Sequence, residues 1–270
     1  MTGTGTGTGT GAVFDDLAAA IRADRPVALA TVFSGPGVGG ALLVEPGTDA
    51  RGTLGDAGLD RVVGRDAQAE LQAGTSGVRH YGPSGEARRD DVSVFIESFA
   101  PPPRMLIFGA VDFTAALVRV AKVLGYRVTV CDAREVFATH ARFPFADEVV
   151  VDWPNRLLER IGHELGPRDA ICVLSHDHKF DVPAVVAAMK TKVGYLGAMG
   201  SRRTHADRVA RLREEGLADE DLARLMAPIG LDIGARTPEE TAVAVCAEII
   251  ALRTGRPAPS LQGGEGSIHR

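Results

Sequence analysis

Short apolar runs alternate with segments of helical length between residues 104 and 200, and this alternation restricts the fold more than any other feature. The runs read RMLIFG, RVTVCD, EVVVD, DAICVLS and KVGYLGAMG. Strands that are apolar throughout are buried on both faces, and helices of crossover length between them make them parallel. The sequence therefore predicts an α/β fold class, with a doubly wound, Rossmann-like parallel sheet in a domain over residues 104–255.

A well-marked helix closes this domain. Thr237, Pro238 and Glu240 combine an N-cap, a proline at the first helical position and a capping-box glutamate. We expect this helix to run to about Arg253 and a flexible tail to follow over residues 256–270.

The preceding part of the chain predicts a smaller α+β domain over residues 12–100. Strand-like runs read VALATVF, GALLVE and VSVFIES, and a helix is expected from Leu59 to Leu71. The prolines at 101–103 fix the backbone and predict a linker between the two domains. The Thr-Gly repeat over residues 1–11 has no apolar surface to bury, so we expect a disordered tail.

Charge and composition exclude several classes of function. A formal net charge of −5 gives no electrostatic footprint for nucleic acid or an anionic membrane. No run approaches the roughly 18 apolar residues of a membrane span, and the first residues lack the pattern of a signal peptide. Cys131, Cys172 and Cys246 have no CxxC spacing, which favours a reduced cytoplasmic protein over a disulfide or zinc framework.

The first candidate site is the stretch IFGAVDFTAA at residues 107–116. Gly109 suits the tight turn of a dinucleotide-binding loop, and Asp132 ends the next strand, where a ribose-binding acid often lies. Val111 replaces the second glycine of G-x-G-x-x-G, and Asp112 adds a negative charge where phosphates would bind. The pattern disfavours NAD(P) in the usual mode, and a capping role for Asp112 explains that residue equally well.

The second candidate site follows the run AICVL at the carboxyl end of a predicted strand. His176, Asp177, His178 and Asp181 carry groups that bind a metal, act as acid and base, or hydrogen-bond a polar ring. No third metal ligand can be assigned, so we predict polar ligand contacts or helix capping and no metal site.

The third candidate site contains Gly200, Ser201, Arg202 and Arg203, between a predicted strand and a helix. Free backbone N–H groups at a helix N-terminus and guanidinium groups both attract a phosphate. The alternative is an N-cap at Ser201 with solvated arginines on a basic helix face.

The fourth candidate site is the loop PIGLDIGA before the last helix. Its glycines, including Gly234, suggest a tight loop that aims Asp232 at a ligand, although a purely structural turn explains the pattern equally well.

These stretches, taken together and in this order, resemble the C-terminal domain of the XdhC/CoxI family of xanthine dehydrogenase accessory factors. The matching pieces are IFGA, VTVCDAR, FADEVVV, LSHDHKFD, GYLGAMGSRRT and PIGLDIGARTPEETAVAVCAEIIA. The resemblance implies a cytoplasmic, homodimeric chaperone without catalytic activity of its own. Such a chaperone binds the molybdenum cofactor, as molybdopterin or its cytosine dinucleotide, and delivers it to the large subunit of an apo-molybdoenzyme of the xanthine dehydrogenase or CO dehydrogenase type. A cysteine desulfurase is a further implied partner.

The resemblance also implies roles for the candidate residues. Ser201, Arg202 and Arg203 would hold the cofactor's phosphate, while Asp132 and the residues 176–178 would meet the pterin. Members of the family usually carry a cysteine motif in the N-terminal domain, whereas this chain has no cysteine before Cys131. Two alternatives stay open: an NAD(P)-binding oxidoreductase or regulator on the same fold, and a homologue that binds a partner enzyme without the cofactor.

Overall fold

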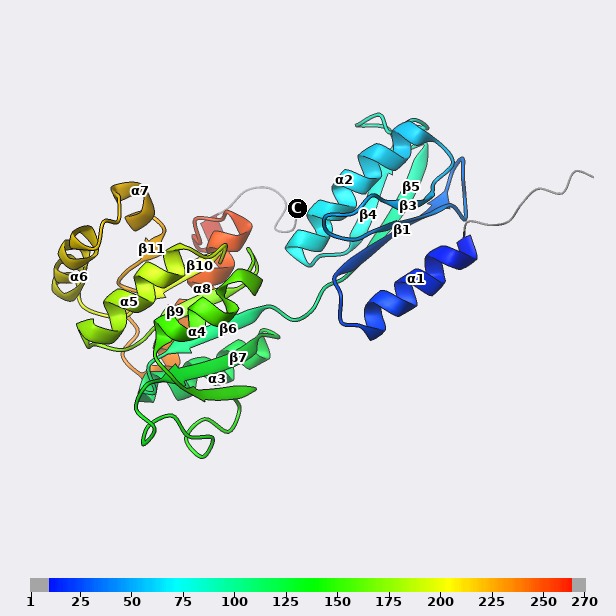
Figure 1. Cartoon of the computed structure of the whole chain (residues 1–270). Coiled ribbons are helices and arrows are strands. Elements are labelled where there is room, and N and C mark those ends of the chain that lie inside the picture. Colours follow the sequence, from blue (N-terminus) through cyan, green and yellow to red (C-terminus); the bar gives the residue numbers. More distant parts are fainter. Residues whose placement is uncertain (1–9, 264–270) are drawn as a thin grey trace, which may run out of the picture. The chain divides into compact units, whose positions relative to one another are not determined.

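The computed structural model describes residues 10–263, and these form two compact units that divide between Pro101 and Pro102. Figure 1 shows both units, with the chain coloured from blue at its start to red at its end. None of the helices within residues 10–263 has the length and apolar character needed to cross a membrane.

The N-terminal unit is an antiparallel sheet between two helices. Its strands have the order β3-β2-β1-β5-β4, and their bounds are β1 Val27–Ser34, β2 Ala41–Val44, β3 Arg51–Thr53, β4 Gly77–Tyr81 and β5 Val92–Phe99. The helices are α1 Thr10–Arg22 and α2 Ala57–Ala73. The α+β prediction for this region is confirmed: the three strand-like runs form β1, β2 and β5, and the expected helix is α2. Helix α1 and the strands β3 and β4 complete the unit.

Alternation along β1 explains why this sheet has a helix on each face. Ala28 and Ala30 belong to the buried cluster that includes residues of α2, whereas Val27 and Leu29 belong to the cluster that includes residues of α1. Successive strand residues point to opposite faces, so one apolar run supplies both cores. Helix α1 begins at Thr10, inside the predicted tail; residues 1–9 of that stretch lie outside the described residues.

The C-terminal unit is a six-stranded sheet in which every strand pairs in parallel with its neighbour. The strand order is β11-β10-β9-β6-β7-β8. The strands are β6 Arg104–Phe108, β7 Arg127–Asp132, β8 Glu148–Val151, β9 Ala170–Val173, β10 Tyr195–Ala198 and β11 Leu225–Met226. This order is that of a dinucleotide-binding Rossmann sheet, with β6 as the first strand. The predicted doubly wound sheet is confirmed.

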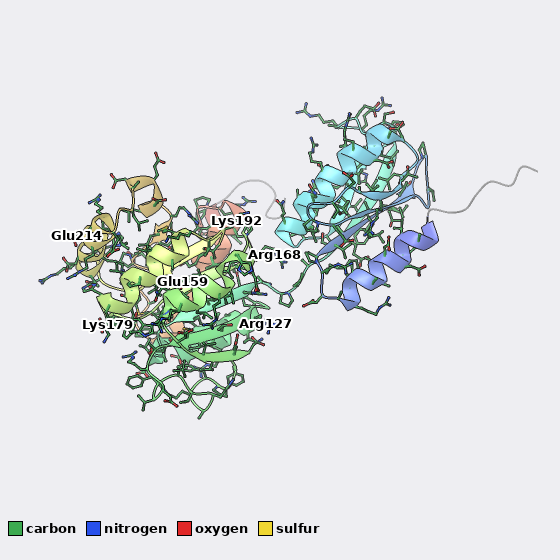
Figure 2. The ribbon with its side chains drawn as sticks, in the orientation of Figure 1. Arg127, Glu159, Arg168, Lys179, Lys192 and Glu214 are labelled. Atoms are coloured by element: carbon green, nitrogen blue, oxygen red, sulfur yellow. The ribbon has the colours of Figure 1, made fainter. Side chains whose placement is uncertain are left out.

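Helices cover both faces of this sheet because its strands are apolar on both sides. The helices are α3 Asp112–Val123, α4 Pro154–Ile161, α5 His178–Met189, α6 Arg202–Glu214, α7 Asp219–Leu222 and α8 Pro238–Thr254. Helices α3 and α8 contribute to one buried cluster, and α4 and α5 contribute to the other. Charged side chains such as Arg127, Glu159 and Lys192 lie on the outside of the unit (Figure 2).

The ends of α8 follow from its sequence. Thr237 Oγ1 accepts from Glu240 N at 3.1 Å, and the Glu240 carboxylate accepts from Thr237 N at 3.1 Å, which completes the predicted capping box. Gly255 ends the helix in a left-handed conformation (φ +65°), which glycine adopts without strain. Of the predicted C-terminal tail, Leu261–Gly263 form a 3-10 turn, and residues 264–270 lie outside the described residues.

Candidate functional site

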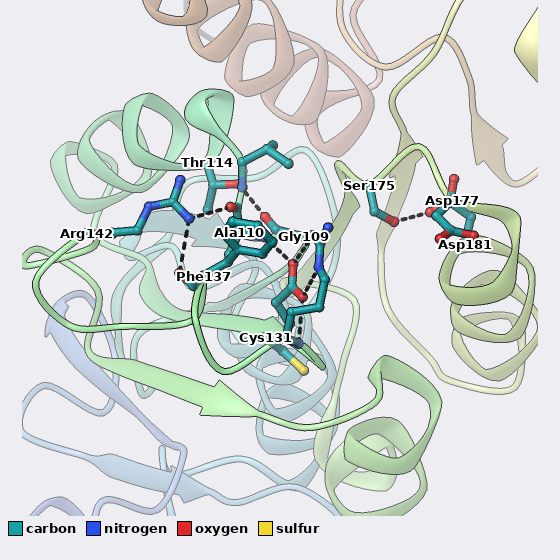
Figure 3. A network of polar contacts seen from close by, with 12 residues as sticks. Gly109, Ala110, Thr114, Cys131, Phe137, Arg142, Ser175, Asp177 and Asp181 are labelled. Carbon is teal, nitrogen blue, oxygen red and sulfur yellow. Dashed lines mark hydrogen bonds and ion pairs between the residues drawn. The ribbon is translucent and has the colours of Figure 1, made fainter.

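The sheet changes winding direction between β6 and β9, because the chain goes from β6 to β7 on one side and returns to β9 on the other. Open α/β sheets bind ligands at the carboxyl ends of the two strands that flank such a point. Gly109, directly after β6, has φ +110°, and an added Cβ would lie 2.8 Å from the backbone nitrogen of Ser175. The loops that follow β6 and β9 therefore pack backbone against backbone (Figure 3).

The loop after β6 is closed by the protein's own groups. Thr114, at the third glycine position of the dinucleotide motif, is fully buried, and its hydroxyl donates to Gly109 O and accepts from Val111 N. Arg142 donates to Ala110 O at 2.9 Å. The Asp112 side chain is 93% exposed and lies 3.7 Å from Arg142 Nη2, while Val111 is the residue at the N-cap position of α3. This loop lacks the open backbone that approaches a pyrophosphate.

Asp132, at the end of β7, is also engaged by the protein. Its carboxylate accepts from Ala110 N at 2.8 Å and from Arg134 Nε and Nη2 at 2.9 and 2.7 Å. Burial raises the pKa of Asp132, but the hydrogen bonds from Arg134 and the backbone outweigh burial and lower it overall. An ionised carboxylate clamped by a guanidinium is not free to accept from ribose hydroxyls. Sequence reasoning missed Arg134, which lies only two residues from Asp132.

A buried charged network lies behind the loop after β9. Ser175 donates to one carboxylate oxygen of Asp181, and Arg208 Nη2 donates to the other at 3.1 Å and to Met199 O at 2.7 Å. Asp181 and Arg208 are fully buried, and within the described residues Nε and Nη1 of Arg208 have no hydrogen-bond partner. Burial raises the pKa of the Asp181 carboxyl above its usual value, while the hydrogen bond from the Ser175 hydroxyl and the charge of Arg208 lower it by less. Asp181 thus joins β9, α5 and α6.

The histidines beside this network lie nearer to solvent. His176 and Asp177 are exposed; Asp177 caps α5 by accepting from Lys179 N at 3.1 Å. His178 is half-buried, and its Nδ1 has no partner within the described residues. Over residues 10–263 no three His, Cys, Asp or Glu side chains converge in an arrangement that would hold a metal ion.

The loop after β10 opens helix α6 with the features of an anion site. Ser201 Oγ caps the helix by accepting from Thr204 N at 3.1 Å, and Gly200 has φ +148°. Arg202 and Arg203 are exposed on the first turn. Nη2 of Arg202 lies 4.0 Å from a carboxylate oxygen of Asp232, so the structure brings the third and fourth candidate sites together.

The loop that carries Asp232 is anchored at its start. Glu248 of α8 accepts from Gly230 N at 3.0 Å and from the Tyr195 hydroxyl at 2.6 Å, and Ile229 N donates to Ala198 O at 3.1 Å. These contacts fix the loop onto β10 and α8. Asp232 and Gly234 remain exposed beyond the anchor.

The three cysteines are fully buried or nearly so. Burial raises the pKa of the Cys131 thiol to about 12, and its Sγ donates to Asp152 O at 3.3 Å. Burial likewise raises the pKa of Cys246 to about 11 and that of Cys172 well above its usual value. These thiols stay protonated near neutral pH and are poor nucleophiles or metal ligands in the folded protein.

Comparisons with known proteins connect this architecture to a family. Residues 105–249 match the model described as the XdhC Rossmann domain, and residues 20–82 match that of the XdhC and CoxI family. A crystal structure of a xanthine dehydrogenase from Bacillus halodurans shares the fold, with a TM-score of 0.54 and 21% sequence identity over 92% of this chain and 98% of that chain.

Two curated relatives align with about three fifths of the chain. Identity is 33% over 161 residues with a probable xanthine dehydrogenase subunit from Bacillus subtilis (strain 168), and 29% over 159 residues with the molybdenum cofactor insertion chaperone PaoD of Escherichia coli (strain K12). The alignments cover 60% and 59% of this chain but 46% and 43% of those proteins. The chain thus matches less than half the length of each. Because the Rossmann-domain model alone matches more than half of the chain, the protein belongs to the XdhC and CoxI family.

Proposed function

We propose that this protein binds a molybdenum cofactor at the carboxyl edge of its Rossmann sheet and delivers it to the large subunit of an apo-molybdoenzyme of the xanthine dehydrogenase or CO dehydrogenase type. The observation that carries the proposal is the contrast between two loops. The loop after β6 is closed by Thr114 and by the Asp132–Arg134 pair, whereas the loop after β10 presents a helix N-terminus with two exposed arginines. An anionic ligand would therefore bind further along the edge than the pyrophosphate of NAD does.

The groups at the loop after β10 fit the phosphate of molybdopterin. Gly200 adopts a backbone conformation (φ +148°) that few other residues tolerate, and Arg202 and Arg203 supply exposed guanidinium groups at the positive end of the α6 dipole. The exposed His176 and Asp177, on the neighbouring strand's loop, offer hydrogen bonds to a polar ring. When bound, the cofactor would supply the molybdenum chemistry, and this chain would bind, orient and shield it. The relative named as a cofactor insertion chaperone supports the same function.

Co-purification tests this proposal. The full chain is expressed in a host that makes molybdopterin, and the pterin released from the purified protein is measured by fluorescence. We expect pterin with the wild type and a large loss with the double variant Arg202→Ala/Arg203→Ala. Arg211→Ala is the matched control, since Arg211 is exposed in the last turn of the same helix, away from its N-terminus.

Thermal shifts with NAD, NADP and NADPH provide the competing outcome. Stabilisation by a nicotinamide nucleotide, with no pterin in the purified protein, would refute the chaperone function and favour a dinucleotide-binding protein. Equal pterin content in the double variant and the wild type would leave cofactor binding in place but remove the phosphate site from the loop after β10. Size-exclusion chromatography with light scattering would test the homodimer that the family implies, and pull-down would test the desulfurase.

A further inference from the structure

Four side chains form a cluster of flat groups near the carboxyl ends of β7 and β8. The guanidinium carbon of Arg134 lies 4.6 Å from the ring centroid of Phe137 and 5.8 Å from that of Phe180. The Trp153 and Phe180 ring centroids are 4.9 Å apart, with their planes tilted by 45°. We refer to Arg134, Phe137, Trp153 and Phe180 as the arginine–aromatic cluster. All of its contacts are within the range of cation–π and ring–ring attraction.

Three members of the cluster keep part of their surface open to solvent, and a second guanidinium carbon, that of Arg142, lies 5.6 Å from the Phe137 ring centroid. Phe137 is 38% exposed, Trp153 is 37% exposed and the Arg134 side chain is 42% exposed, whereas Phe180 is nearly buried beneath them. Large aromatic side chains usually bury most of their area in a core. Here two aromatic rings and a guanidinium group keep a substantial part of their area accessible at the same edge.

Hydrogen bonds connect the cluster to the winding-change point of the sheet. Asp132 holds Arg134 in a bidentate pair and also accepts from Ala110 N, in the loop after β6. Phe180 lies in the first turn of α5, and the loop that leads into this helix packs against Gly109. The cluster thus receives residues from both sides of the crevice, and Asp132 restrains its guanidinium group.

This combination of groups selects a particular ligand chemistry. Delocalised ring faces and a planar cation attract another flat, delocalised ring through stacking and cation–π interactions. We propose that the arginine–aromatic cluster stacks the planar heterocycle of the ligand, which is the pterin or, in a dinucleotide form of the cofactor, the nucleobase. The inference rests on the proposed function and adds a ring subsite to it, separate from the phosphate site at Arg202 and Arg203.

Trp153 makes the subsite measurable, because it is the chain's single tryptophan. The full chain is titrated with pterin, cytidine monophosphate and, as an anion without a ring, inorganic phosphate, while Trp153 emission is recorded with inner-filter correction. We expect saturable quenching by a ring-bearing probe and none by phosphate. The tighter of the two ring probes identifies which heterocycle the cluster accepts.

Variants at the cluster separate stacking from a structural role. Phe137→Leu keeps an apolar side chain but removes the ring, and we expect it to weaken binding of the ring probe by about tenfold or more. Phe145→Leu is the matched control, because Phe145 is 60% exposed and lies in the same connection between β7 and β8. Within residues 10–263, the Phe145 ring stacks on no other ring and on no cation of the cluster. Unchanged thermal midpoints establish that both variants are folded.

Each outcome has a distinct meaning. Equal affinity of Phe137→Leu and the wild type for the ring probes would overturn the subsite, as would quenching by phosphate that matches quenching by pterin. Pterin in the purified wild type with no binding of any ring probe would also overturn the subsite and leave the proposed function in place. Ring binding that depends on Phe137, in a protein that purifies without pterin, would support the subsite while the proposed function fails.

Discussion

The buried pair of Asp181 and Arg208 allows a quantitative test of how the C-terminal unit is held together. In Asp181→Asn the side chain keeps its shape but loses its charge, so the Arg208 cation stays buried without a counter-ion. The carbonyl of Met199 would then be its main acceptor, because Nε and Nη1 of Arg208 have no partner within the described residues. Removing one member of a buried ion pair costs about 3–5 kcal/mol, and we expect a loss in that range.

Urea unfolding of the full chain, followed by Trp153 emission, measures this loss for the unit that contains both residues. With a urea dependence of about 1–3 kcal/mol per molar, the midpoint should fall by at least about 1 M. Asp219→Asn is the matched control: Asp219 is 82% exposed and lies 2.9 Å from Arg213. An exposed pair of this kind contributes under about 1 kcal/mol, so the control midpoint should hardly move.

The double replacement Asp181→Leu/Arg208→Met completes the test. Apolar residues in place of a whole buried pair are often neutral or stabilising, so the double variant should recover much of the loss seen in Asp181→Asn. A loss in Asp181→Asn no larger than that in the exposed control would refute the reasoning, because it would mean that Arg208 does not depend on this carboxylate.

Three further predictions concern the C-terminal unit. Gly109→Ala places a Cβ 2.8 Å from Ser175 N at φ +110° and should lower the free energy of unfolding by more than about 2 kcal/mol. The control Gly125→Ala, at φ +81° with no atom within 4 Å of the added Cβ, should lower it by about 1 kcal/mol in the same denaturation assay. The pKa of Asp132 is lowered on folding, so the ionised carboxylate stabilises the folded state above about pH 4. This stabilisation is lost as the pH falls through the pKa of Asp132 in the folded state, and Asp132→Asn should flatten the resulting acid-side decline in melting temperature. The buried thiols should react with DTNB only on unfolding, and a fast-reacting Cys131 in the native protein at pH 8 would contradict its raised pKa.

The elements of the sheet were predictable because each rests on a local pattern. The runs around Ile107 and Ile171 are apolar throughout, as strands buried on both faces require, and Thr237 with Glu240 marks a helix start by its own hydrogen bonds. The strands β3, β4 and β11 escaped prediction, since they are short or largely polar and owe their pairing to neighbours distant in the sequence.

The candidate site was predictable in its location but not in its contacts. Strand ends followed by polar residues indicated the carboxyl edge, because parallel strands share it. Nothing in the sequence separates Arg208 from the exposed arginines of α6, yet it is fully buried on Asp181. Similarly, Thr114 and Arg134 are ordinary residues in the sequence, and their roles arise from atoms that only the fold brings near.

The closure of the loop after β6 has a consequence for how this lineage can change. Building a dinucleotide site here would require a glycine at Val111, loss of the Thr114 hydroxyl that bonds Gly109 O, and release of Asp132 from Arg134. Each change alone removes an interaction within the protein before any contact with a nucleotide can replace it. A mutational path from this loop to nicotinamide binding would therefore pass through less stable intermediates.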